Sequence, residues 1–116
     1  MYKFVIEGGK KLKGDVEVSG AKNASLALIP ATLLANGDFS ITNTPELRDV
    51  TTMSQLMKAI CAKIHFENNV ININTKKIKK YEAPYDHVKK MRASIYVLGP
   101  LLARYNQAKV SLPGGC

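Results

Sequence analysis

Three places in the chain carry side chains that could act on an anionic ligand. The first is Lys22-Asn23, which opens an apolar segment just after Ser19-Gly20. A helix N-terminus offers unpaired N–H groups and the positive end of the helix dipole, which suit a phosphate or a carboxylate. Lys22 adds a full positive charge at that point. The alternative is a polar helix start with a solvated lysine.

Arg92 is the second place, within Tyr85-Asp86-His87-Val88-Lys89-Lys90-Met91-Arg92. Its guanidinium can bind a phosphate or carboxylate through two parallel hydrogen bonds, which the neighbouring lysines cannot do. The alternative is an ordinary ion pair on the surface of a helix, with Asp86 as a partner.

Cys116 is the third place, directly after Pro113-Gly114-Gly115. Two glycines let the backbone approach a ligand closely and expose the thiol, whose reactivity then depends on nearby positive charge. Cys61 falls on an apolar helical stripe, so we expect an inert core residue. His65 and His87 have no Cys or carboxylate partners at metal-ligand spacing, so we expect no metal site.

Composition narrows the class of protein. A length of 116 residues with 46% hydrophobic residues predicts one globular domain. No window approaches the roughly 18 unbroken apolar residues of a membrane span, and the first residues do not resemble a secretory signal. Two cysteines cannot form a disulfide framework, which favours a reducing cytoplasm. We therefore expect a cytoplasmic protein without a membrane segment.

The net charge of +8 is the unusual figure, and 14 of the 17 basic residues are lysines. The densest group, Lys76-Lys77-Ile78-Lys79-Lys80, has no aromatic residues interleaved, unlike a typical nucleic-acid surface. We interpret it as a solvated connector, although the charge is also compatible with a basic site for a small phosphorylated ligand.

Hydrophobic patterning predicts an alternation of strands and helices. Short strands are expected over 4–7 and 15–18, a helix over 24–35 that is apolar nearly all round, and a strand over 39–42. A helix without a polar face must be buried on most sides, and Pro30 should kink it or remove one hydrogen bond.

The rest of the chain continues this alternation. Asp49 is expected to cap a second helix, whose apolar stripe comprises Met53, Leu56, Met57, Ile60, Cys61 and Ile64. The segments 63–67 and 70–74 flank Asn68-Asn69 and predict a hairpin. A third helix is expected from about Tyr85 to Arg104, and a final strand over 109–112.

An internal repeat appears when the chain is shifted by 69 residues. Ala24-Ser25-Leu26-Ala27-Leu28-Ile29 then falls on Ala93-Ser94-Ile95-Tyr96-Val97-Leu98 without a gap. Few of these positions are identical, so chance similarity between two buried helices is the alternative. Because each helix also precedes a turn and a strand, we interpret residues 22–74 as one full β/α unit and residues 85–112 as the start of a second.

Several motifs together resemble one known family. They are Ser19-Gly20-Ala21-Lys22-Asn23-Ala24, Pro84-Tyr85-Asp86, Met91-Arg92-Ala93-Ser94, Leu98-Gly99-Pro100-Leu101 and Ser111-Leu112-Pro113-Gly114-Gly115-Cys116. In this order and register the chain resembles the UDP-N-acetylglucosamine enolpyruvyltransferases over its whole length. The sister family, 5-enolpyruvylshikimate-3-phosphate synthase, resembles it less, because that family generally lacks the Leu-Pro-Gly-Gly-Cys loop.

The resemblance implies transfer of the enolpyruvyl group of phosphoenolpyruvate to the 3-hydroxyl of UDP-N-acetylglucosamine, the first committed step of peptidoglycan synthesis in the cytoplasm. It implies that Lys22 holds phosphoenolpyruvate, that Asn23 contacts the bound substrates and that Arg92 binds an anionic group. Cys116 matches the proton donor that fosfomycin alkylates. No cofactor, metal ion, nucleic acid or membrane is implied.

The resemblance also implies an α/β fold, part of an inside-out α/β barrel whose repeated β/α units bury their helices. Residues 1–21 would pack with a second domain, and residues 22–116 would form an incomplete catalytic domain. The chain would then be a truncated part of a longer enzyme, inactive by itself. The rival expectation is a small basic nucleotide- or RNA-binding module.

Overall fold

The apolar segment after Gly20 forms a helix in the computed structural model, which describes residues 2–89 and 91–111. This helix, α1 (Lys22–Ala31), tightens after Pro30 into a short 3₁₀ helix, η1 (Thr32–Leu34). Pro30 has no N–H to donate, so one hydrogen bond of the helix is missing there. Burial falls on one side of the segment: Ile29 and Leu33 are fully buried, whereas Leu28 is 51% exposed.

A three-stranded antiparallel sheet completes the first half of the chain. Its strands are β1 (Asp38–Ile41), β2 (Lys63–Glu67) and β3 (Val70–Asn74), in the order β1-β3-β2. The hairpin of β2 and β3 has the predicted bounds. Asn68 and Asn69 both have positive φ, at 51° and 59°, as a tight two-residue turn between strands requires.

The second helix, α2 (Arg48–Ala59), presents part of the predicted apolar stripe to the core: Met53, Leu56 and Met57 are fully buried, as is Ile60 at the C-cap. Val50 extends the stripe, whereas Ile64, expected on it, lies in a strand after the helix has ended. The expected cap at Asp49 is wrong. Leu47 occupies the N-cap position with extended backbone, and Asp49 lies in the first helical turn. Since residues of the first turn already have helical backbone, the Asp49 side chain is free to reach a neighbouring element.

Cys61 is not a core residue, contrary to expectation. It is half-buried and has a φ of 76°, just past the end of α2. Its N–H donates to the Lys58 carbonyl at 2.9 Å, and the Ala62 N–H donates to the Met57 carbonyl at 3.0 Å. These two bonds are those of a Schellman motif, in which the residue after the helix has left-handed backbone and is usually glycine.

The expected third helix is broken into three pieces. They are α3 (Tyr85–Val88), the 3₁₀ helix η2 (Arg92–Val97) and α4 (Leu98–Tyr105). Met91 is extended, with φ of −156°, and its side chain is buried. The Met91 carbonyl accepts two hydrogen bonds from Ser94, one from the hydroxyl at 2.6 Å and one from the backbone N–H at 3.2 Å. The backbone bond is the i→i+3 bond with which the 3₁₀ helix η2 begins.

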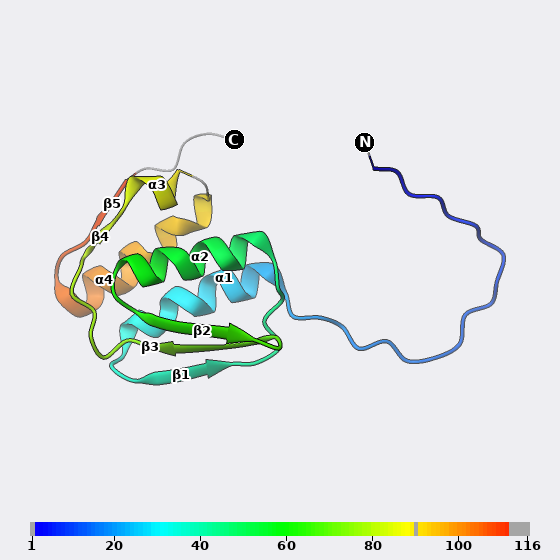
Figure 1. Cartoon of the computed structure of the whole chain (residues 1–116), viewed down its shortest axis with the longest axis horizontal. Helices are drawn as coiled ribbons and strands as arrows, with labels where there is room; N and C mark the ends of the chain where they lie inside the picture. Colours follow the sequence, from blue (N-terminus) through cyan, green and yellow to red (C-terminus); the bar gives the residue numbers. More distant parts are fainter. Residues whose placement is uncertain (1, 90, 112–116) are drawn as a thin grey trace.

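A short parallel pair, β4 (Glu82–Ala83) and β5 (Lys109–Val110), brackets these helical pieces. Leu112, the expected end of the last strand, lies outside the described residues. The helical segments α1–η1 and η2–α4 are each followed by a turn and a strand, and the repeat inferred from the 69-residue offset stays a prediction. Figure 1 shows the three-stranded sheet along one side of the helices and the β4–β5 pair along another. Helices inside and sheets outside are the arrangement that we expected.

The expected strands over 4–7 and 15–18 are not formed. Residues 2–19 are exposed throughout, and Figure 1 draws them as a long extended segment leading away from the body. A strand needs a neighbour to supply its hydrogen bonds, and none of the described strands pairs with this segment. Within residues 2–89 and 91–111, no helix is long and apolar enough to cross a membrane.

Gly20 marks the point at which this segment joins the body. Its N–H donates to the Asn43 Oδ1 at 2.9 Å. A Cβ added at Gly20 would lie 1.7 Å from the backbone oxygen of Asn43, so only glycine fits. Asn43 is itself fixed, because the adjacent Thr44 exchanges hydrogen bonds with Asn69 in the hairpin turn.

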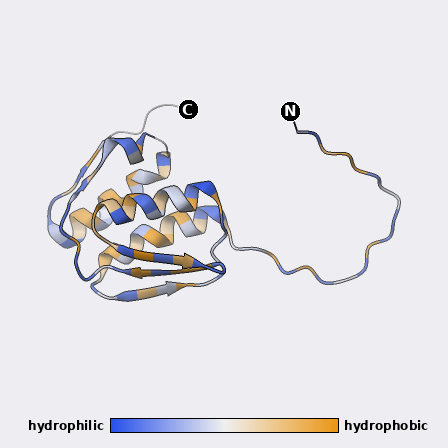
Figure 2. Ribbon diagram, in the orientation of Figure 1, coloured by the Kyte–Doolittle hydropathy of each residue, from blue (hydrophilic) through white to orange (hydrophobic). Residues whose placement is uncertain are grey.

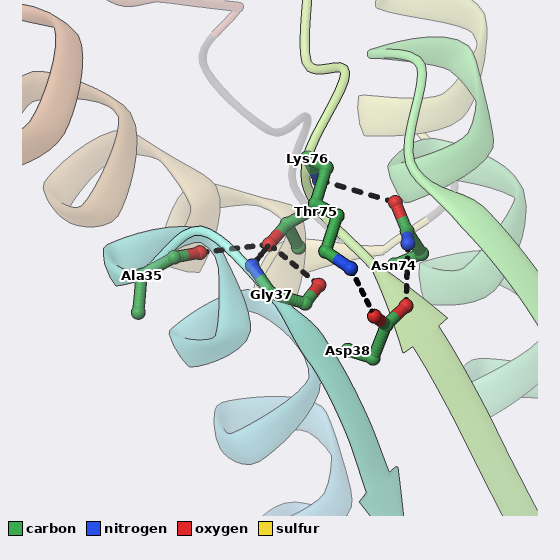
Figure 3. Close-up of polar contacts among 6 residues, drawn as sticks. All are labelled: Ala35, Gly37, Asp38, Asn74, Thr75 and Lys76. Carbon is green, nitrogen blue, oxygen red and sulfur yellow. Dashed lines mark hydrogen bonds and ion pairs between the residues drawn. The ribbon is translucent and has the colours of Figure 1, made fainter.

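A cluster of hydrogen bonds, here called the polar joint, holds the opposite end of the sheet (Figure 3). It comprises Ala35, Gly37, Asp38, Asn74, Thr75 and Lys76. The buried Thr75 hydroxyl donates to the Ala35 carbonyl at 2.7 Å, and its N–H donates to the Gly37 carbonyl at 3.0 Å. Beside it, the carboxylate of Asp38 accepts hydrogen bonds from Asn74 and Lys76. These bonds tie the turn after η1 to the end of β3.

Candidate functional site

The N-terminal ends of α1 and α2 lie at the same end of the fold. Both helices run in the same direction in Figure 1, and they pack against each other. Figure 2 colours these two ends as hydrophilic, whereas the following part of α1 is largely hydrophobic and α2 alternates hydrophilic and hydrophobic residues. The candidate site of Lys22 and Asn23 is therefore the polar end of a helix that buries one side, and not most sides as expected.

Lys22 and Asn23 are the first two residues of α1, and both are exposed. Ala21 precedes them as the N-cap, with no side-chain hydrogen bond to cap the helix, and the first turn contains no acidic residue. The first N–H groups of an α-helix have no acceptor within the helix. This end of α1 can therefore donate hydrogen bonds to an anion, and the dipole favours negative charge there.

Lys22 is not a freely solvated lysine. Its Nζ lies 3.1 Å from the Oδ2 of Asp49, in the first turn of α2. The two side chains are 48% and 40% exposed, so the pair sits at the rim of the helix packing and still faces solvent. Sequence reasoning missed Asp49 as a site residue, because it assigned this carboxylate to the capping of α2.

Arg92 is the first residue of η2 and is exposed. Asp86, the alternative partner, forms an ion pair with Lys89 at 2.6 Å. Among residues 2–89 and 91–111, no carboxylate lies within ion-pair distance of Arg92. Because η2 packs against both α1 and α2, the element that begins with Arg92 borders both helices of the Lys22–Asp49 pair.

Cys116, the third sequence candidate, lies outside the described residues. One groove, lined by residues 17–19, Asn43 and Asn69, adjoins the Gly20 turn just before α1, but Lys22 does not line it. Two further grooves lie elsewhere. One is lined by Phe39, Ile64, Ile73 and polar neighbours on the three-stranded sheet, and another by residues 80–82 and 107–109. Neither includes Lys22, Asn23 or Arg92. The structure thus presents the Lys22 ammonium and the N-terminus of α1 to a small anion at an open surface, and among the described residues no hydrogen bond or ion pair joins Arg92 to them.

Comparison with known proteins gives consistent relatives. The family model described as EPSP synthase (3-phosphoshikimate 1-carboxyvinyltransferase) matches residues 6–116. Proteins named UDP-N-acetylglucosamine 1-carboxyvinyltransferase are 56% identical in Chlorobaculum parvum, 58% in Chloroherpeton thalassium and 53% in Geotalea daltonii. Each alignment covers 100% of this chain but only 27–28% of the relative.

A solved structure gives the same result for the fold. The enolpyruvyl transferase NikO from Streptomyces tendae matches with a TM-score of 0.71 and 25% sequence identity, over 84% of this chain and 23% of that chain. The chain therefore spans about a quarter of the length of the proteins that it matches.

Proposed function

The chain belongs to the EPSP synthase family, and on that premise we propose that it forms the first part of an enolpyruvyltransferase that acts on UDP-N-acetylglucosamine. The observation that carries this proposal is the agreement in name of relatives that are 53–58% identical over the whole chain. The same match favours an enzyme over a small basic nucleotide- or RNA-binding module.

In the proposed reaction, the oxygen of the 3-hydroxyl of UDP-N-acetylglucosamine releases its proton to a base and bonds to the C2 carbon of phosphoenolpyruvate, while the C3 carbon takes up a proton from an acid. A tetrahedral ketal results. The methyl group of the ketal then loses a proton, the C–O bond to phosphate breaks, and the enol ether forms with release of inorganic phosphate. Both substrates are anionic, which agrees with a chain of net charge +8.

The residues of the candidate site have separate roles in this proposal. Lys22 and the N–H groups of α1 bind phosphoenolpyruvate, Asn23 contacts the bound substrates, and Arg92 binds a phosphate or carboxylate group. The exposed ammonium of Lys22 supports these roles, as does the exposed guanidinium of Arg92, which has no carboxylate partner within residues 2–89 and 91–111. Cys116 is the proton donor and the target of fosfomycin-type epoxides, by its match to the family's loop.

The proposal extends to the organisation of the protein. Residues 1–21 belong with a second domain, and the extended, exposed course of residues 2–19 supports a segment that does not belong to this body. Residues 22–74 form one repeat unit, and residues 85–112 begin the next unit of the catalytic domain. We place the enzyme in the cytoplasm, at the first committed step of peptidoglycan synthesis.

A full-length chimera tests the function. It joins this chain to the part of the Chlorobaculum parvum relative that follows the aligned region, and phosphate release is measured with both substrates. Lys22→Ala and Arg92→Ala should each reduce the binding free energy of phosphoenolpyruvate by about 1.5–3 kcal/mol per charged hydrogen bond removed. Such a loss weakens phosphoenolpyruvate binding about tenfold or more.

Lys58→Ala is the matched control, because Lys58 is an exposed lysine in the last turn of α2, at the other end of that helix from Asp49. Its kinetics should not change. A folded chimera without turnover would contradict the function. Turnover that is unchanged in both Lys22→Ala and Arg92→Ala would remove the site assignment.

A further inference from the structure

The ion pair of Lys22 and Asp49 connects two helix N-termini that the backbone does not otherwise join. The two residues are separated by a turn, a strand and a loop, and only the packing of α1 on α2 brings them together. The Nζ to Oδ2 distance of 3.1 Å makes the contact an ion pair. The role of Asp49 in this contact is not explained by helix capping.

The charges favour this contact from both sides. A lysine in the first turn of α1 faces the positive end of its own helix, which is unfavourable, and α1 has no acidic residue in that turn to offset it. Asp49 supplies the missing negative charge from α2, where a carboxylate in the first turn is favourable. Its placement therefore stabilises the ammonium at a point where the helix alone would repel it.

The contact also restricts a flexible side chain. A lysine ammonium is a compact charge on a flexible four-carbon stem, so its position depends on its partners. We propose that Asp49 is a positioning residue that holds the Lys22 ammonium beside the N–H groups of α1, so that both meet the same anionic group of phosphoenolpyruvate. This inference rests on the proposed function and on the role of Lys22 in it.

A purely electrostatic view makes the opposite prediction. If Asp49 only placed a negative charge near the anion site, its removal would strengthen the binding of an anionic substrate. If Asp49 positions Lys22, its removal weakens binding, because the ammonium no longer lies beside the helix N-terminus. The sign of the change in the KM for phosphoenolpyruvate therefore separates the two views.

The test uses the full-length chimera with Asp49→Ala, Asp49→Glu, Lys22→Ala and the Lys22→Ala/Asp49→Ala double variant. Asp49→Ala should raise the KM for phosphoenolpyruvate about tenfold, the loss expected of one charge-assisted bond. The KM for UDP-N-acetylglucosamine should change less, and Asp49→Glu should restore part of the loss. The double variant should be no worse than Lys22→Ala, because Asp49 acts through Lys22.

Asp38→Asn is the matched control, since Asp38 forms a lysine ion pair at the start of β1, far from the N-termini of α1 and α2. It should leave both KM values unchanged, and circular dichroism should find each variant folded. An unchanged or lowered KM in Asp49→Ala, or additive losses in the double variant, would overturn the positioning role while the proposed function stands. Unchanged kinetics in Lys22→Ala would overturn the Lys22 assignment and this role together.

Discussion

The guanidinium of Arg104 donates a hydrogen bond to the carbonyl oxygen of Ala35 at 2.8 Å, across a separation of 69 residues. This separation equals the 69-residue offset of the proposed repeat, on which Arg104 would contact its own counterpart, Ala35. The same nitrogen donates to the Leu33 carbonyl at 3.0 Å. Arg104 thereby satisfies two carbonyls at the end of η1 that have no helical partner.

Replacing Arg104 should therefore loosen the contact between the two units. Arg104→Ala removes two charged hydrogen bonds at a half-buried position, and we expect a loss of about 1–2 kcal/mol in the free energy of unfolding. Urea denaturation measures this loss. Arg48→Ala, at an exposed arginine that begins α2, is the control and should change stability by less than about 0.5 kcal/mol. Equal effects of the two changes would contradict the role of Arg104.

Gly20→Ala should weaken the joint between residues 2–19 and the body. The added methyl group would overlap the Asn43 carbonyl, and neither backbone can move without breaking the Gly20–Asn43 hydrogen bond. We expect the free energy of unfolding to fall by about 1–3 kcal/mol, as for other overpacked positions. Gly8→Ala serves as the control, because a Cβ at Gly8 meets no atom within 4 Å. Similar unfolding curves for the two variants would exclude a tight approach at Gly20.

The stability of the polar joint at β1 should depend on pH. The hydrogen bond from Lys76, and then the one from Asn74, hold the pKa of Asp38 below its ordinary value. A lowered pKa contributes stability above the ordinary value of about 4, and this contribution is lost as the pH falls through the native pKa. The stability difference between the unmodified protein and Asp38→Asn should therefore shrink between pH 6 and pH 3. A difference that stays the same at every pH, from 6 down to well below the ordinary pKa of Asp38, would contradict this origin.

The two cysteines should respond differently to an epoxide such as fosfomycin. Cys116→Ser in the chimera should abolish alkylation and sharply reduce turnover, because a hydroxyl is a weaker acid and nucleophile than a thiol. Cys116→Asp still offers a proton donor but is a poor nucleophile, so it should keep turnover and resist the inhibitor. Mass spectrometry of the labelled protein identifies the modified residue.

Cys61→Gly is the matched variant for that experiment. Glycine adopts the left-handed backbone of position 61 without a Cβ clash, so the fold should be retained and alkylation should continue at the remaining cysteine. Loss of labelling in Cys61→Gly, or continued labelling of Cys116→Ser, would identify Cys61 as the reactive thiol instead.

The sequence predicted local structure best where a few neighbouring residues determine it. Asn68-Asn69 tolerate positive φ, so the hairpin has the bounds expected from its turn. The stripe of α2 faces the core because its spacing matches the period of a helix. The segment after Tyr85 also has helical spacing, but it is divided at Met91, where the backbone is extended and the side chain is buried. No local sequence pattern predicts this break.

The candidate site was only partly accessible to sequence reasoning. Lys22 and Arg92 could be proposed from residue type and position, since each begins a helical segment. Asp49 could not, because its contact with Lys22 depends on α1 and α2 packing with their N-termini at the same end. The prediction of strands over 4–7 and 15–18 was wrong for a related reason. Alternating apolar and polar residues form a strand only when a partner strand is present.

The parallel pairing of β4 with β5 has a consequence for local unfolding. Each strand contributes two residues, and all of α3, η2 and α4 lie between them in the chain. The pair can close only after these helical pieces have packed, because a parallel pair needs its crossover in place. Its backbone amides should therefore exchange with deuterium sooner than those of β3, which is bonded on both sides.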